Sequence, residues 1–212
     1  MQPVVPPIIR ECVVDSARRL GLALDALEWP SSGKNASPSE LNALIGFQCA
    51  VMRSDPGFHF YSEGTMIDRG RIDLMGSNGH LHLVIEAKRL NDLSASAERV
   101  SSDLLFLGNF KPSCYLPKPH VPSNWWDAPT GERWGLLLIT SFLGNSVREA
   151  WEAADADAAR AIIQNRKRWR NFEPFISLRE SPGLMRFSAP ITLPDRWKYE
   201  SEGWVLAGAV PL

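Results

Sequence analysis

Apolar residues recur at helical spacing near the start of the chain, at Ile9, Val13, Ala17, Leu20 and Leu24. Positions three and four apart share one face of an α-helix, so this spacing predicts an amphipathic helix. The same reasoning predicts three later helices, and runs of apolar and aromatic residues predict strands. The expected helices span 8–27, 37–54, 94–107 and 146–169, and the expected strands span 58–63, 69–75, 80–88, 134–141, 175–178, 184–188 and 204–210.

Turn residues connect these segments in an informative way. The sequence Gly76-Ser77-Asn78-Gly79 predicts a tight turn, so the second and third strands should form a hairpin. The segment 134–141 is almost continuously apolar, which is typical of a central strand covered on both faces. Before it, 111–131 is a long insertion rich in proline. The order of helix, helix, three strands, helix, strand, helix and β-rich tail predicts an α/β fold with a mixed sheet between helices.

Composition adds only broad limits. A chain of 212 residues that is 44% apolar and 22% charged can form one globular domain over 1–212. Its core should span about 37–170, with 8–27 and 172–212 as elaborations. The three cysteines are far apart and match neither a zinc pattern nor a disulfide framework. No signal peptide or membrane span is recognisable, so the expected location is cytoplasmic, without a membrane partner. The net charge of −1 favours a local phosphate contact over a broad basic surface.

Three ionisable residues interrupt the apolar strands of the predicted hairpin. Asp73 lies between Ile72 and Leu74, while Glu86 and Lys88 lie two apart near the end of the next strand and share a face. Charged groups in buried strands are costly unless they pair with each other or bind a cation. Two neighbouring carboxylates suit a hard divalent ion, and Mg²⁺ needs only one or two of them. The alternative is a buried ion pair of Lys88 with Glu86 or Asp73 and no metal.

The same set fits phosphodiester hydrolysis. A metal held by Asp73 and Glu86 can polarise a phosphate and lower the pKa of a bound water. Lys88 can position that water or stabilise the developing negative charge. The sequence therefore predicts Asp73, Glu86 and Lys88 as catalytic residues, with Mg²⁺ or Mn²⁺ as the cofactor.

The segment Gly70-Arg71-Ile72-Asp73-Leu74, followed across a hairpin by Ile85-Glu86-Ala87-Lys88, resembles the PD-(D/E)XK nuclease superfamily. This resemblance implies a restriction-endonuclease-like αβββαβ core, which matches the element order expected from 37 to about 141. It also implies that Asp73, Glu86 and Lys88 correspond to the acidic, acidic and lysine positions of the family motif. Ile72 stands where the motif has proline. Glu40 occupies a place similar to a helical glutamate that many members carry, so it is a further catalytic candidate.

Several supporting residues have two readings each. Glu40 is either a metal or water ligand or the capping-box partner of Ser37. Arg71, on the face of Asp73, contacts either a phosphate or a nearby acid. Arg99 contacts a phosphate or pairs with Asp103 one turn away. A basic run at the end of the last expected helix suits a nucleic-acid backbone, although cations also favour that end of a helix. The run contains Arg166, Lys167, Arg168, Trp169 and Arg170.

The expected function is that of a metal-dependent nuclease acting on DNA, in restriction, repair or a mobile element. The expected biological role, in restriction, repair or a mobile element, follows from the resemblance alone. The alternative is a catalytically quiet binding or regulatory module with the same fold. RNA in place of DNA, endo- or exonuclease action, and a homodimer or larger complex are left open by the sequence.

Overall fold

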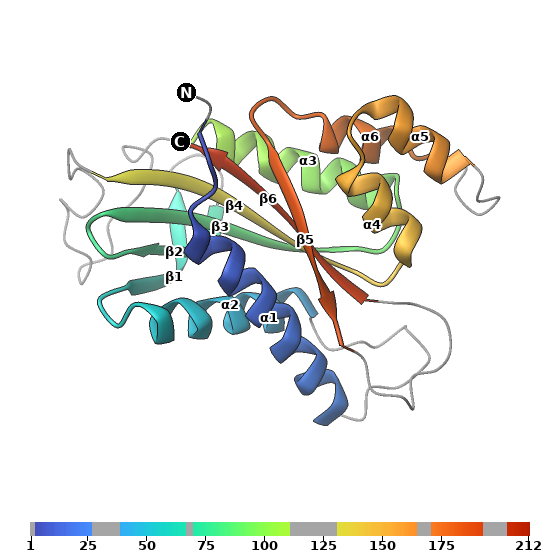
Figure 1. The fold of residues 1–212 in the computed structure, drawn as a ribbon. Coiled ribbons are helices and arrows are strands. Elements are labelled where there is room, and N and C mark those ends of the chain that lie inside the picture. The colour runs from blue at the N-terminus through green and yellow to red at the C-terminus, as the bar shows by residue number, and fades with distance from the viewer. Residues whose placement is uncertain (1–2, 27–38, 67–69, 111–130, 165–170, 193–202) are drawn as a thin grey trace.

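A computed structural model describes residues 3–26, 39–66, 70–110, 131–164, 171–192 and 203–212. The helices in this part of the chain are α1 (Pro7–Ala26), α2 (Ser39–Ser54), α3 (Ala95–Gly108), α4 (Asn145–Glu152), α5 (Ala156–Gln164) and α6 (Glu173–Arg179). The strands are β1 (His59–Met66), β2 (Gly70–Ser77), β3 (Leu81–Leu90), β4 (Glu132–Ser141), β5 (Met185–Ile191) and β6 (Gly203–Pro211) (Figure 1).

The described strands form one six-stranded sheet in the order β1-β2-β3-β4-β6-β5. Strands β3 and β4 are parallel, and the other neighbours are antiparallel. Helix α3 connects the two parallel strands, as a parallel pair requires a long crossover. Strand β6 pairs with β4, so the C-terminal extension completes the sheet that the earlier strands begin. The expected α/β class with a mixed sheet is confirmed.

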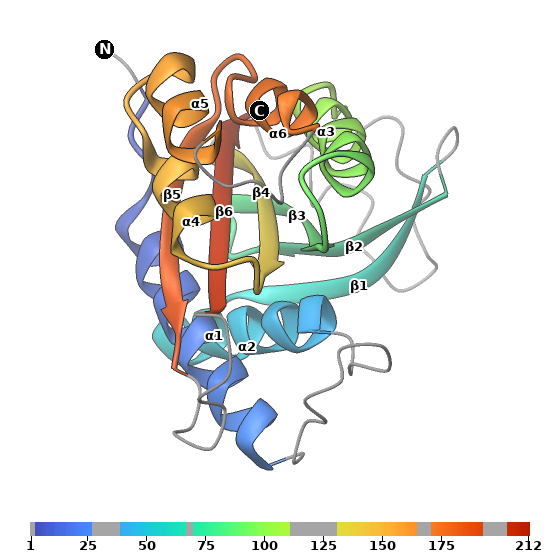
Figure 2. The same ribbon diagram turned by 90° about the vertical axis from the view of Figure 1, so that its right-hand side faces the viewer.

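Helices cover both faces of the sheet, which gives three layers (Figures 1 and 2). Successive side chains of a strand point to opposite faces, and β4 separates its residues in this way. Leu136 and Leu138 pack in the cluster that contains the buried faces of α1 and α2. Leu137 and Ile139 pack in the second cluster, with the buried residues of α3 to α6. The expectation of a central strand covered on both faces is therefore confirmed.

The turn between β2 and β3 is the one predicted from Gly76-Ser77-Asn78-Gly79. Gly79 has a φ of 87°, a left-handed conformation that glycine adopts without strain. The Asn78 side-chain oxygen accepts hydrogen bonds from the backbone N–H groups of His80, at 2.9 Å, and Leu81, at 2.8 Å. This local network holds the hairpin in register and places the charged residues of β2 and β3 on adjacent strands.

The helix expected over 146–169 is wrong as a single element. The chain leaves α4 at Ala153, whose ψ of 149° is extended, and re-enters a helix at Ala156. Asp155 caps this second helix, because its side-chain oxygen accepts the Ala158 N–H at 2.8 Å. The apolar spacing continues across the break, so periodicity alone did not reveal it.

The strand expected at 175–178 is also wrong, because these residues lie in helix α6. Pro174 lies in the first turn of this helix, where the missing N–H of proline is harmless. A four-residue apolar run fits a short strand and a buried helix equally well. The other two strands expected in the tail are present as β5 and β6.

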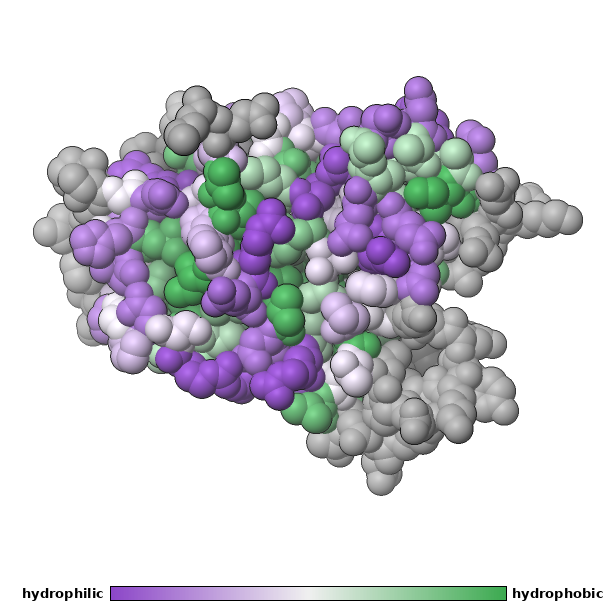
Figure 3. Space-filling model, viewed as in Figure 1, coloured by the Kyte–Doolittle hydropathy of each residue, from purple (hydrophilic) through white to green (hydrophobic). Residues whose placement is uncertain are grey.

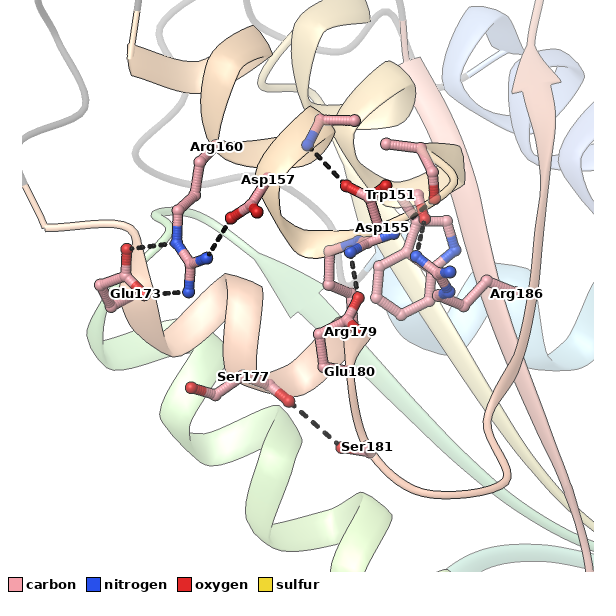
Figure 4. Close-up of polar contacts among 12 residues, drawn as sticks. Trp151, Asp155, Asp157, Arg160, Glu173, Ser177, Arg179, Glu180, Ser181 and Arg186 are labelled. Carbon is pink, nitrogen blue, oxygen red and sulfur yellow. Dashed lines mark hydrogen bonds and ion pairs between the residues drawn. The ribbon is translucent and has the colours of Figure 1, made fainter.

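Two arginines bind backbone carbonyl groups near the end of α4, one from helix α6 and one from strand β5, and we call Arg179 and Arg186 the arginine cluster (Figure 4). The Arg179 guanidinium donates to the Ala153 carbonyl at the α4–α5 break and pairs with Glu180. Arg186, on β5, donates to the Trp151 carbonyl at 2.8 Å. Each arginine thus satisfies a backbone acceptor where α4 ends.

The face in Figure 3 mixes hydrophilic and hydrophobic residues, with hydrophilic ones gathered over α4. Among the residues that the structure describes, no helix is long and apolar enough to cross a membrane.

Candidate active site

The site lies where strands β2 and β3 separate. Their pairing runs from Ser77↔His82 to Leu74↔Ile85 and ends there. Beyond this point β2 continues along β1, while β3 continues along β4 as far as Leu90. In Figure 2 the β1–β2 pair extends away from the rest of the sheet. Asp73 and Glu86 are the first residues past the last pair, so the fork between the strands opens at these two side chains.

The structure brings Asp73, Glu86 and Lys88 together at this fork. The Lys88 Nζ lies 2.9 Å from Glu86 Oε2 and 3.5 Å from Asp73 Oδ2. Asp73 Oδ2 also accepts the backbone N–H of Ala87 at 2.9 Å. This hydrogen bond fixes the Asp73 carboxylate against β3, although β2 no longer pairs with β3 here. The two carboxylates therefore face one ammonium from adjacent strands.

A fourth charged residue joins them from helix α3. Asp103 Oδ2 lies 3.8 Å from Lys88 Nζ. The sequence reading considered Asp103 only as a partner for Arg99, one turn away on the same helix. Its approach to Lys88 depends on the packing of α3 against β3, which local spacing does not encode. We call Asp73, Glu86, Lys88 and Asp103 the fork cluster; it holds three carboxylates around one ammonium.

Burial and charge change the acidity of the fork cluster. Glu86 is only 4% exposed, and burial raises its pKa to about 7 with help from Asp73 and Asp103, against the opposing effect of Lys88. For Lys88, burial favours the neutral amine, but Glu86, Asp73 and Asp103 outweigh it and raise its pKa. Lys88 therefore remains charged at neutral pH, while the pKa of Glu86, at about 7, lies close to neutral pH.

An open pocket of about 490 Å³ adjoins the fork cluster. Asp73 and Lys88 line one side, and helix α2 lines the other, with Glu40 at its N-terminal end. Ser39, the first residue of α2, forms a 2.8 Å hydroxyl hydrogen bond with Thr140 of β4, which anchors this end of the helix to the sheet. Glu40 thus shares a pocket with Asp73 and Lys88, whereas the buried Glu86 does not line it. Its proposed capping partner, Ser37, lies outside the described residues.

The structure describes only part of the predicted nucleic-acid contacts. Arg99 is exposed on α3, where it donates to the Ala95 carbonyl at 3.3 Å and to the Ser96 hydroxyl at 3.5 Å. Arg71 lies on β2 opposite Thr65, but its side chain is outside the described part of the chain. The remaining predicted contacts also lie outside the described residues: Arg166, Lys167, Arg168 and Arg170.

The donor set of the fork fits a small hard cation. Within the described residues, no group of three or more His, Cys, Asp or Glu side chains could hold a metal ion. Mg²⁺ needs only one or two carboxylates because it keeps several of its waters, and Asp73 and Glu86 supply two from facing strands. Burial is the main cause of the raised pKa of Glu86, and the carboxylates of Asp73 and Asp103 add to it. A divalent cation would relieve the repulsion between these carboxylates.

Comparison of the chain with protein-family models, with curated proteins and with solved structures found no match.

Proposed function

We propose that this chain is a metal-dependent nuclease that hydrolyses DNA phosphodiester bonds. The observation that carries the proposal is the fork itself, which gathers Asp73, Glu86 and Lys88 beside an open pocket. The element order α2-β1-β2-β3-α3-β4, with β3 and β4 parallel, agrees with a restriction-endonuclease-like core. The PD-(D/E)XK resemblance of the sequence supports the same assignment.

Asp73 and Glu86 would hold a Mg²⁺ or Mn²⁺ ion between the separating strands. When bound, such an ion activates a water and polarises the scissile phosphate. The Ala87 N–H keeps the Asp73 carboxylate oriented toward the fork, which reduces the reorganisation needed when a ligand enters. Glu86 must lose its proton to bind a cation, and its raised pKa places that loss near neutral pH.

Lys88 supplies the positive charge at the reaction centre. Its Nζ now contacts the carboxylates of Glu86 and Asp73. When the carboxylates bind a cation, the ammonium is free to turn toward the phosphate or the attacking water. It would then stabilise negative charge that grows in the transition state. Glu40, across the pocket, is suited to orient water from the α2 side.

One observation favours a second candidate function, a catalytically quiet binding module with the same fold. The 2.9 Å contact of Lys88 with Glu86 is also the geometry of a structural ion pair. In such a protein the fork cluster would hold β2, β3 and α3 together without a metal.

A cleavage assay separates the two functions. The purified chain is incubated with Mg²⁺ or Mn²⁺ and with labelled single-stranded, duplex and branched DNA, and with EDTA as the control. The nuclease proposal expects metal-dependent cutting of at least one substrate. If no substrate is cut with either metal, the binding module becomes the better account.

A further inference from the structure

The pocket beside the fork has an apolar wall that the nuclease chemistry does not use. Leu41, Leu44 and Ile45 line it from helix α2. Leu41 is 48% exposed and Ile45 is 47% exposed, so neither side chain is covered by the fold. They are four residues apart and lie on one stripe of the helix, which continues to Gln48 in the same pocket.

The opposite side of the pocket carries three charged residues: Lys88 and Arg89 of β3 and Asp73 of β2, beside the apolar Leu74 and Ala87. The exposed leucine and isoleucine of α2 therefore face a side of the pocket that contains Asp73 and Lys88 of the fork cluster. A nucleotide also combines apolar and charged parts, since its base is flat and largely apolar on its faces while its phosphate is an anion.

We propose that this pocket binds one unstacked base, with its phosphate at the fork, and we call this base-binding site the seat. The substrate is then single-stranded DNA or a frayed or flapped end. The proposal rests on the proposed nuclease function. The base packs against Leu41 and Ile45, and the amide of Gln48 is placed to hydrogen-bond to a base edge. Bases in an intact duplex are stacked on each other and do not reach this wall unless they are flipped out.

The charges of the pocket agree with a single strand. Its cationic lining residues are Lys88 and Arg89, and these are matched by the acids Glu40 and Asp73. A duplex presents two rows of phosphates and usually requires a wider basic surface. A single strand gains affinity from its base faces and needs fewer phosphate contacts.

Binding measured without cutting tests the seat directly. Fluorescence anisotropy follows a labelled single-stranded oligonucleotide, the same strand with abasic sites, and a duplex, with Ca²⁺ in place of Mg²⁺. Leu41→Ser and Ile45→Ser should each weaken single-strand binding about fivefold or more and leave duplex binding unchanged. Ile45→Trp should strengthen single-strand binding, because an aromatic ring stacks better on a base.

The matched controls are Leu22→Ser on α1 and Leu105→Ser on α3, since these leucines are 60% and 61% exposed and do not line the pocket. The wild-type chain should also bind the abasic strand more weakly than the intact one, and Ile45→Ser should remove that difference. Equal binding of intact and abasic strands by the wild type, or equal losses in the control variants, overturns the seat.

The outcome separates the seat from the nuclease proposal. If Ile45-dependent binding of single strands is found but no DNA is cut, the nuclease function fails and the seat stands. If duplex DNA is cut and Ile45→Ser changes neither cutting nor binding, the nuclease function stands and the seat fails.

Discussion

The fork cluster and the arginine cluster both gather charged side chains, but they pair these charges with different partners. In the arginine cluster, Arg179 and Arg186 donate hydrogen bonds to carbonyl groups at the end of α4, and Arg179 also pairs with Glu180 (Figure 4). In the fork cluster, three carboxylates surround Lys88 at the edge of an open pocket. The first arrangement holds the end of α4 to α6 and β5. In the fork cluster, carboxylates that now contact Lys88 could bind a cation in its place, as a binding site requires.

The largest expected effect is on cutting. Asp73→Asn, Glu86→Gln and Lys88→Ala should each reduce the cleavage rate by about 100- to 1,000-fold, because the carboxylates hold the metal and the ammonium stabilises transition-state charge. Thermal stability should be kept or raised by Asp73→Asn and Glu86→Gln, because each removes one of three neighbouring carboxylates, and it should fall for Lys88→Ala, which leaves those carboxylates without a counter-charge. Initial rates and melting temperatures measure the two effects. Asp157→Asn and Glu149→Gln, both exposed on the α4–α5 layer, are the controls. Normal cutting by any of the three variants contradicts its assigned role.

Substitution in the arginine cluster should lower stability and leave cutting unchanged, which is the reverse of the effect of removing a fork carboxylate. Arg179→Ala should lower the free energy of unfolding by about 3 kcal/mol, since it leaves the Ala153 carbonyl without its donor and creates a cavity. Cutting by the molecules that remain folded should be normal. Urea unfolding measures the loss, with the exposed Arg18→Ala as the control. A loss as small as that of the control would show that Arg179 does not hold the helices.

The acidity of Glu86 gives a prediction for pH. Its pKa is raised from the ordinary value of 4.5 to about 7, so the folded state keeps a proton that the unfolded state loses. Glu86 therefore lowers stability progressively as pH rises from about 4.5 to 7, by up to about 3 kcal/mol. In EDTA, Glu86→Gln should match wild type near pH 4.5 and be more stable at pH 8. Unfolding curves across this range measure the difference, and a constant difference at all pH values would contradict it.

Asp103 should have the smallest effect. Its carboxylate is 3.8 Å from Lys88 and 30% exposed, so solvent weakens the interaction. Asp103→Asn should reduce cutting less than about fivefold. It should also move the pH midpoint of cutting downward, because Asp103 helps to raise the pKa of Glu86. Glu98→Gln, exposed on the same helix, is the control. An unchanged midpoint would remove Asp103 from the fork cluster.

Local patterns predicted those parts of the molecule that local physics determines. The helical spacing of α1, the turn at Asn78-Gly79 and the two-residue spacing of Glu86 and Lys88 were sufficient to predict these elements. The break before Asp155 was missed because a capping residue does not disturb the apolar pattern. Helix α6 was missed because its apolar run is short.

Long-range packing accounts for the remaining differences. The insertion of β6 between β4 and β5 and the position of α2 across the pocket from β3 each bring together segments far apart in the chain. Asp103 is no farther from Lys88 in sequence than Asp73 is, but its approach to Lys88 depends on how α3 packs against β3. Asp73, Glu86 and Lys88 could be predicted because a turn sequence predicts the hairpin that brings them together.

The most direct test of the account is whether the fork binds a divalent cation. Isothermal calorimetry at pH 8, with Mn²⁺ or Mg²⁺ titrated into the wild-type chain, should show saturable binding. Asp73→Ala should abolish it, and Asp157→Ala, which removes an exposed carboxylate elsewhere, should leave it unchanged. Absence of binding to the wild type, or equal binding by Asp73→Ala, would contradict the claim that the fork cluster is a metal centre.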